Sequence, residues 1–406
     1  MPPVWLVRLY QVLFAMLPWS VEYSFGNWAI ELPAEPLLAI SGIGLLLAWR
    51  QAGFPLPKLR VFHTAILIWS VWLCATAFSS SMPIVSWKYV LVSIGHLWVF
   101  GVGVTLFPGL WRKVWPGFFW SMAGVALYTI IHHGFFYQFR SVQANLAPMP
   151  FFADHTVFGA VTVMAIWGAT STVEKLTRYK GLAIALLVAA LLLTASRAAA
   201  LSLFTTAYLA CWFLLKRHWQ KKVLLAFTVT CLAALAYWQP YLSGKLAGDV
   251  SSRERLNRWS CAWRMSFDRP WTGFGPGTFA FQYLPYQKPE EMTRISVVEP
   301  ITRRHPSNYG RGGGAHSEYA QALAETGWPG LALWLLVVVA ALRQGAQNYF
   351  RAATPGQRRL ALFLLLGLSS FFLHGLVNNF LHDARMAALV WSMAMAGWVG
   401  GLEGHN

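Results

Sequence analysis

The sequence is poor in charged residues, and above all in acidic ones. Asp, Glu, Lys and Arg make up 12% of its 406 residues, and the 15 acids face 32 Lys and Arg. Soluble domains usually carry about 25% charge. With 56% hydrophobic residues and a mean hydropathy of +0.46, this composition argues against an ordinary soluble domain and predicts a protein embedded in lipid. A net charge of +17 would suit a nucleic-acid binder, but the placement of the cations argues against that class.

Cysteine is also scarce. Of the four cysteines only Cys261 lies in the long hydrophilic segment described below, so the sequence predicts no disulfide there. The first apolar run has no small-residue cleavage site and is soon followed by further apolar runs. We therefore expect it to be a retained helix rather than a signal peptide.

Apolar runs recur along the chain, with lengths close to the roughly 20 residues that a helix needs to cross a bilayer. They predict an all-α polytopic membrane protein with about 12 transmembrane helices. The candidate spans are 4–20, 33–49, 61–79, 83–107, 115–136, 151–171, 181–195, 197–215, 222–238, 328–342, 360–378 and 384–401.

The cations alternate between successive loops. One set of loops holds 17 of the 32 Lys and Arg, whereas the short loops between them hold only Lys88, Arg140, Arg197 and Arg385. Because basic loops stay in the cytoplasm, both termini are expected inside and residues 239–327 outside. The predicted organisation is transmembrane helices 1–9 in 1–238, one large extracytoplasmic loop with short helices in 239–327, and helices 10–12 in 328–406.

The first part of this loop, 251–267, reads as a helix. Ser251 and Glu254 fit a capping box. The Gly-rich segment 271–279 follows; no strand precedes it and no Lys-Ser or Lys-Thr pair follows, so an irregular turn is a better interpretation than a phosphate loop. The helix carries an apolar stripe at helical spacing, made of Leu256, Trp259, Trp263 and Phe267.

His316 is the candidate base of the loop. It follows the Gly-rich stretch 310–314 and is expected to start a short helix over 316–326, which ends at Gly327 before Pro329 opens the next span. A helix N-terminus lowers the pKa of a histidine and keeps its imidazole neutral, as a base requires. The alternative is a surface or packing histidine. His374 and His382, which flank Asn378-Asn379, are secondary candidates.

Arginines are the candidate phosphate ligands. Apart from Lys245 and Lys288, every cation of the loop is Arg, and guanidinium groups bind phosphate in a bidentate manner. Arg197 follows Thr194-Ala195-Ser196 at the outer end of a span, where an unpaired charge is costly. A solvated surface and a snorkelling side chain are the alternatives. The candidates that would contact phosphates of the donor or the acceptor are Arg140, Arg197, Arg258, Arg264, Arg303, Arg304, Arg311 and Arg385.

Three segments in this order resemble the O-antigen ligase and O-antigen polymerase family of bacterial envelopes. They are Ser196-Arg197; Arg258 with Ala262-Trp263-Arg264 and Asp268-Arg269-Pro270-Trp271-Thr272-Gly273-Phe274-Gly275; and His316-Ser317-Glu318-Tyr319 with Glu325-Thr326-Gly327-Trp328-Pro329-Gly330. With the span count and the single late loop, the resemblance covers essentially the whole chain. Many relatives have Asn where this chain has Ser317.

The resemblance implies a C-type glycosyltransferase-like fold in the bacterial inner membrane, with a periplasmic active site. It implies transfer of a glycan from undecaprenyl diphosphate to a lipid A–core sugar, with inversion and without metal or other cofactor. The loop has no spaced acidic pair for a metal, since Glu290-Glu291 is adjacent. The family's histidine base and two arginines fall on His316, Arg197 and Arg264, with Arg258 as the alternative to Arg264.

Other functions remain open at this point. A polymerase of the same family would use a second carrier-linked glycan as acceptor, and a protein O-oligosaccharyltransferase would use a protein. Polymerases more often have two sizeable outer loops, and the protein-glycosylating relatives tend to be longer. A transporter or flippase would more often show paired broken spans and buried charges mid-membrane. The expected partners are the donor, the acceptor and membrane lipids, with no nucleic acid.

Overall fold

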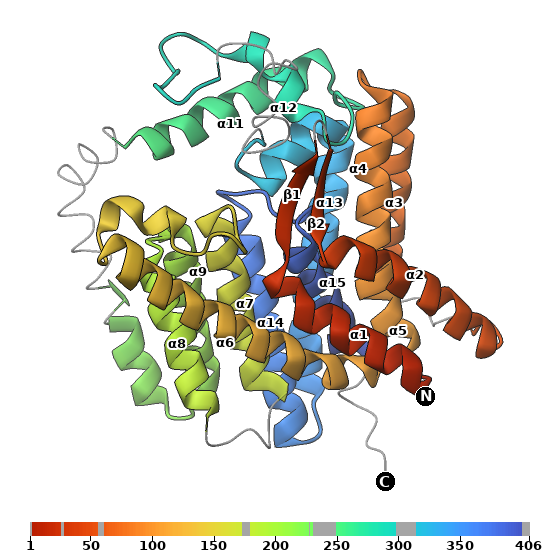
Figure 1. The fold of residues 1–406 in the computed structure, drawn as a ribbon, viewed down its shortest axis with the longest axis vertical. Helices are drawn as coiled ribbons and strands as arrows, with labels where there is room; N and C mark the ends of the chain where they lie inside the picture. Colours follow the sequence, from red (N-terminus) through yellow and green to blue (C-terminus); the bar gives the residue numbers. More distant parts are fainter. Residues whose placement is uncertain are drawn as a thin grey trace.

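The computed structural model describes residues 2–25, 28–55, 61–172, 179–226, 228–229, 249–297 and 314–399. Helices pack side by side in a bundle, and 249–297 lies across one end of it (Figure 1). The helices are α1 (Val4–Met16), α2 (Ala34–Gln51), α3 (Val61–Phe78), α4 (Pro83–His96), α5 (Gly103–Leu106), α6 (Leu110–Tyr137), α7 (His155–Thr172), α8 (Lys180–Leu193), α9 (Arg197–Leu214), α11 (Val250–Asp268), α12 (Phe279–Gln282), α13 (Glu318–Arg351), α14 (Pro355–His374) and α15 (Ala384–Val399).

Short irregular elements join some of these helices. A π-helical turn over Leu97–Val102 links α4 to α5, and 3-10 turns cover Leu17–Trp19, Ser141–Leu146 and Leu284–Tyr286. The strands β1 (Val21–Phe25) and β2 (Trp28–Leu32) pair antiparallel, with Val21 opposite Leu32 and Phe25 opposite Trp28. This hairpin was not predicted from the sequence.

The predicted apolar runs coincide with helices. A helix lies over each of them except 222–238, which falls mostly outside the described residues. Six helical segments are long and apolar enough to cross a membrane: Val61–Phe78, Pro83–Leu106, Leu110–Tyr137, Arg197–Leu214, Glu318–Arg351 and Pro355–His374. Val4–Trp19, His155–Ala169, Lys180–Leu193 and Ala384–Ala396 are shorter apolar helices. The protein is therefore a multi-pass membrane protein, and the number of twelve spans stays a prediction.

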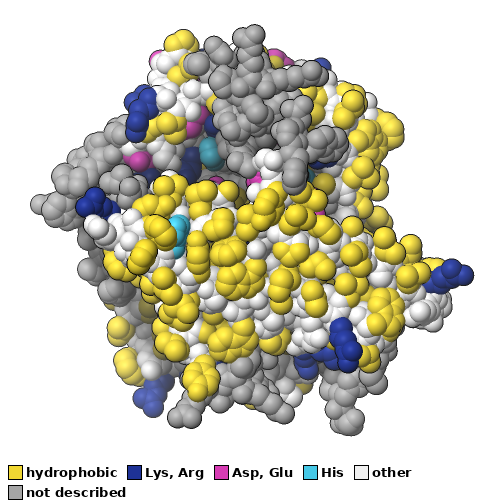
Figure 2. All heavy atoms as spheres, in the orientation of Figure 1, with side chains coloured by type: hydrophobic (Ala, Val, Ile, Leu, Met, Phe, Trp, Pro, Cys, Tyr) yellow, Lys and Arg dark blue, Asp and Glu magenta, His cyan; other side chains and the backbone are white. Residues whose placement is uncertain are grey.

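The surface of the bundle fits this environment. Figure 2 shows a broad hydrophobic band over the helices, with most of the visible charged side chains above and below it. Inside the bundle, large aromatic side chains pack against small residues. For example, a Cβ added at Gly168 of α7 would lie 1.8 Å from the Trp115 ring of α6. Such close approach is typical of helix packing in membranes, where small residues let helices come together.

Helix α13 is sharply bent where it enters the bundle. Gly327 has φ 71° and ψ −176°, a conformation essentially confined to glycine, and divides the helix into a short and a long part. The sequence predicted this break at Gly327. The Gly-rich turn packs into the bend, because the Trp328 amide donates to the Pro270 carbonyl at 2.8 Å and the Phe274 amide donates to the Ala324 carbonyl at 3.0 Å. Segment 271–279 is therefore a structural turn, as predicted.

Glu325 of α13 also binds the Gly-rich turn 271–279. Its carboxylate is buried and accepts the backbone amides of Gly277 at 2.8 Å and Phe279 at 3.0 Å. A Cβ at Gly273 would lie 2.3 Å from the Glu325 carbonyl carbon, so only glycine allows this approach of two backbones. The loop is thus joined firmly to the short part of α13, which directly follows His316.

Helix α11 corrects one detail of the sequence analysis. It begins after Asp249, whose side chain accepts the Ser252 amide, so the capping box predicted for Ser251 and Glu254 is wrong. The physical reason is that the Asp249 carboxylate caps the helix two residues before Ser251. The predicted apolar stripe exists but points outward: Leu256, Trp263 and Phe267 are exposed by 58%, 52% and 62%.

Candidate active site

His316 lies between α11 and the loop that joins α14 to α15. Its amide donates to the Asn379 side-chain oxygen at 3.1 Å, and its carbonyl accepts the Trp259 indole N–H at 3.2 Å. These two contacts hold the backbone in a left-handed conformation with φ 51°. Ser317, not His316, caps α13, because its hydroxyl accepts the Ala320 amide. The histidine therefore lies two residues before Glu318, the first residue of the helix that was predicted to begin with it.

The surroundings of His316 favour the neutral imidazole. Burial is the largest cause and lowers its pKa to about 3, and the positive charges of Arg258 and Arg255 act in the same direction. Glu254 opposes them. The predicted direction of the pKa shift is the same, but its causes are burial and two arginines rather than the helix N-terminus. The imidazole is consequently uncharged at neutral pH.

Arg258 connects α11 to the segment that carries His316. It is almost completely buried, and it donates to Glu254 at 3.0 Å and to the Gly314 carbonyl at 2.9 Å. Its guanidinium also lies 5.1 Å from the centre of the Tyr283 ring. The cation is thus bound to Gly314, two residues before the histidine in sequence, and is close enough to influence the protonation of His316.

Glu254 compensates the buried charge of Arg258. Its second oxygen accepts the hydroxyls of Ser296 at 2.5 Å and Thr293 at 2.8 Å. Burial alone would raise the pKa of Glu254, but these hydrogen bonds and Arg258 outweigh it and lower the pKa. The carboxylate therefore stays ionised and joins α11 to residues 293–297.

Arg197 opens α9 and pairs with the residue that caps α11. Its guanidinium donates to Asp249 at 2.7 Å, and the Ser252 amide and hydroxyl donate to the same carboxylate oxygen. Burial would raise the pKa of Asp249, but the hydrogen bonds from Ser252 and Arg197 lower it. The Arg197 side chain is 61% exposed, so its guanidinium remains accessible to a ligand.

Arg255 was not among the predicted site residues. Its Nε donates to the Val377 carbonyl at 3.2 Å. Its pKa is lowered by burial and then by the charge of Arg197, and its own charge lowers the pKa of His316. Arg255 therefore links the surroundings of Arg197 electrostatically to those of the histidine. Arg255 lies almost one turn before Arg258 and faces the bundle. This spacing from Arg258 is the signal in the sequence that could have identified it.

Arg264 lies on another face of α11. It donates to both carboxylate oxygens of Glu291, at 3.1 and 2.6 Å, and to the Tyr286 carbonyl at 2.7 Å. These partners lie in the 284–291 part of the loop, whereas Arg258 binds the segment next to His316. The structure thus brings Arg258 and Arg255 toward the histidine, pairs Arg197 with Asp249 at the start of α11, and directs Arg264 to a separate ion pair.

The other predicted arginines are dispersed. Arg385 is buried, donates to Asp383 at 2.7 Å and Glu31 at 3.0 Å, and stacks 4.4 Å from the centre of the Phe152 ring. Arg140 is exposed and donates to the Gln138 side chain. Arg303, Arg304 and Arg311 lie outside the described residues.

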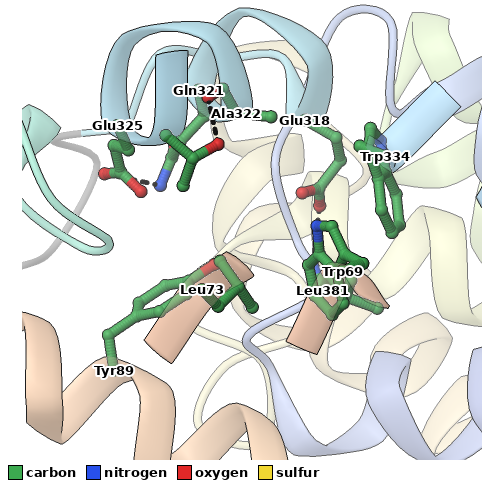
Figure 3. A pocket seen from close by; sticks show the side chains of 10 residues that line it. Trp69, Leu73, Tyr89, Glu318, Gln321, Ala322, Glu325, Trp334 and Leu381 are labelled. Carbon is green, nitrogen blue, oxygen red and sulfur yellow. Dashed lines mark hydrogen bonds between the residues drawn. The ribbon is translucent and has the colours of Figure 1, made fainter. Parts of the chain in front are cut away.

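A small cavity adjoins the short part of α13 (Figure 3). Glu318 and Glu325 both line it, with Tyr89 and Trp69 on the opposite wall. The Glu318 carboxylate accepts the Leu381 amide at 2.7 Å, as Glu325 accepts amides of the Gly-rich turn. Both acids thus fix neighbouring backbone. No cluster of three His, Cys, Asp or Glu side chains suited to a metal ion occurs within the described ranges.

Comparison with known proteins gives one family. Residues 182–335 match the model of the O-antigen ligase family. No curated protein matches the chain. The matched region contains Arg197, Arg258, Arg264 and His316, whereas Arg140 and Arg385 lie outside it. The three segments in which the sequence resembles this family begin within the same region, and the match supports the assignment of this chain to the O-antigen ligase family.

Proposed function

We propose that the protein is an O-antigen ligase that transfers a glycan from undecaprenyl diphosphate to a sugar of lipid A–core, at the periplasmic face of the inner membrane. The family match supports a glycosyltransferase-type role in O-antigen or lipopolysaccharide assembly. The observation that carries the finer proposal is the position of His316. A neutral imidazole lies between α11 and the loop that joins α14 to α15, under the influence of Arg258 and Arg255 and within the matched region.

The reaction needs one base and a site for a leaving diphosphate. The acceptor hydroxyl oxygen attacks the anomeric carbon while its proton passes to His316, a general-base contribution of typically 10²–10⁴-fold. The bond between that carbon and the diphosphate oxygen breaks, and the carrier diphosphate leaves with the electron pair. Attack opposite the leaving group inverts the anomeric configuration. Arg197 and Arg258 stabilise the charge that develops on the diphosphate.

The arginines also adjust the strength of the base. With no ligand, burial and, after it, the charges of Arg258 and Arg255 hold the pKa of His316 low, so the imidazole accepts a proton poorly. A bound diphosphate compensates their positive charge and raises that pKa. The histidine therefore becomes a stronger base when the donor is bound, which limits wasteful proton transfer in the empty site.

Arg258 is our choice for the second diphosphate ligand, with Arg264 as the alternative. Both guanidinium groups are paired with a carboxylate, but Arg258 binds the Gly314 carbonyl next to His316, whereas Arg264 binds Tyr286 and Glu291 in another part of the loop. Replacing each arginine by Gln distinguishes them when turnover is measured per folded molecule, because loss of the diphosphate ligand lowers turnover beyond any loss of stability. The remaining candidates Arg140, Arg303, Arg304, Arg311 and Arg385 would contact outlying phosphates of donor or acceptor.

The test of the reaction is a reconstituted transfer assay with chelator present. Purified protein in lipid vesicles receives carrier-diphosphate-linked glycan and lipid A–core, and products are separated by size and by acceptor label. We expect glycan on lipid A–core. Lengthening of the carrier-linked glycan instead would identify a polymerase, and transport of the donor without new glycosidic bonds would identify a flippase.

A further inference from the structure

Helix α11 is amphipathic in the opposite sense to a helix on a soluble protein. The side that packs against the rest of the molecule carries polar and charged residues, among them Glu254, Asn257 and Arg258, together with Cys261 and Met265. The side away from it carries large apolar residues. We call this surface the aromatic ridge; it consists of Leu256, Trp263, Phe267, Trp271 and Trp328, which are 58%, 52%, 62%, 74% and 40% exposed.

Three rings of the ridge are in contact with one another. The Trp263 ring lies 5.3 Å from that of Phe267 and 5.5 Å from that of Trp328, measured between ring centres. A soluble protein that exposed so many neighbouring aromatic residues would present an aggregation or interaction site. The ridge therefore needs an apolar partner.

The position of Trp328 indicates the partner. It begins the long part of α13, whose exposed face continues through Leu335, Leu336 and Val339, by 43%, 44% and 58%. That face belongs to a candidate membrane span, so its surroundings are lipid. The ridge continues this lipid-facing stripe beyond the bend in α13, onto a helix that runs across the end of the bundle (Figure 1).

The composition of the ridge fits the boundary between headgroups and acyl chains. Tryptophan is enriched at this depth, because its ring is apolar and its N–H bonds to polar headgroups. Exposed Arg253, one turn before Leu256, supplies a cation near the phosphates. Interfacial helices combine these features and lie in the plane of the membrane.

We propose that α11 is an interfacial helix and that the aromatic ridge inserts into the phospholipid leaflet on the side of the bundle where the loop lies. Because α11 also binds the His316 carbonyl through Trp259, this insertion fixes the height of the candidate base above the lipid. The anchoring itself does not depend on the proposed glycan transfer. It requires only that the candidate spans cross a bilayer.

The test uses the full chain in vesicles, with its native cysteines replaced by serine and an environment-sensitive fluorophore on one new cysteine. Phe267→Cys places the probe on the ridge, and Leu256→Cys gives a second probe in case the first variant fails to fold. Glu290→Cys is the matched control, since Glu290 is an exposed, charged residue of the same loop and not part of the ridge. Thermal unfolding checks that each labelled protein is folded.

The probes are quenched from the membrane and, separately, from the water, and the two efficiencies are compared between ridge and control. We expect a nitroxide at the headgroup–acyl boundary to quench the ridge probes several-fold more than the Glu290 probe, and aqueous iodide to quench in the reverse order. Equal behaviour of ridge and control probes would overturn the proposal. Protection of the ridge probes from both quenchers would also overturn it, because a second copy or another part of the chain would then cover the ridge.

Discussion

Replacing Arg258 by Met tests the buried ion pair that holds α11 to the site. The side chains of Arg258 and Glu254 are only 5% and 3% exposed, so the change leaves a carboxylate in a nearly dry position. Breaking a buried pair in this way costs about 3–5 kcal/mol. Because Ser296 and Thr293 still donate to Glu254, we expect a loss near the lower end, about 3 kcal/mol.

Unfolding of the purified protein in detergent measures this loss, in a double-mutant cycle with Glu254→Gln. The neutral amide removes the unpaired charge, so the double variant should recover much of the stability lost by Arg258→Met, with a coupling of about 2 kcal/mol. Arg264→Met is the matched control, because its pair with Glu291 is 25% and 29% exposed and is expected to contribute about 1 kcal/mol or less. If Arg258→Met costs no more than Arg264→Met, the inferred role of the buried pair is refuted.

Three further changes follow from the same contacts. Gly327→Ala should destabilise the protein by about 2 kcal/mol or more in thermal unfolding, since its φ of 71° with ψ −176° suits only glycine; an unchanged melting temperature would contradict this. Arg255→Gln removes a positive neighbour and should raise the pKa of His316 from about 3, so transfer activity should fall at a higher pH on the acid side; an unmoved acid limb would argue against the base. Arg264 lowers the pKa of Glu291, so their ion pair should stabilise the protein above pH 4.5 and lose this contribution as the pH falls through the folded-state pKa. Arg264→Met should abolish this pH dependence when the free energy of unfolding is measured as a function of pH.

The helices of the bundle could be predicted because a lipid environment permits few backbone conformations. Backbone groups in a bilayer must bond within their own segment, so a long apolar run implies a helix. The break in α13 was likewise visible in Gly327 and Pro329. The hairpin of β1 and β2 was not, because its strands are only five residues each and pair mainly with one another.

The orientation of α11 shows what periodicity leaves undecided. The spacing of Leu256, Trp263 and Phe267 identifies an apolar stripe, but it does not say whether protein or lipid covers it. In the structure the polar side of α11 is the one that faces the protein, and the apolar stripe is exposed.

The residues of the candidate site were easiest to nominate where they lie close in the chain. His316 and the arginines of α11 share one loop, and the sequence could nominate them together. Arg385 instead pairs with Glu31, 354 positions away, and its residue type alone suggested a phosphate ligand. The choice between Arg258 and Arg264 depends on which helix face meets residues 314–316, and only the packing of the loop reveals that.

The most direct test of the account is the activity of His316→Ala in the reconstituted transfer assay. His218→Ala is the matched control, because His218 is exposed on the chain between α9 and the loop. We predict that the wild type and the His218 variant attach glycan to lipid A–core, and that the His316 variant, folded to the same melting temperature, loses transfer by at least about a hundredfold. Wild-type rates in the His316 variant would contradict the proposed base, and with it the mechanism.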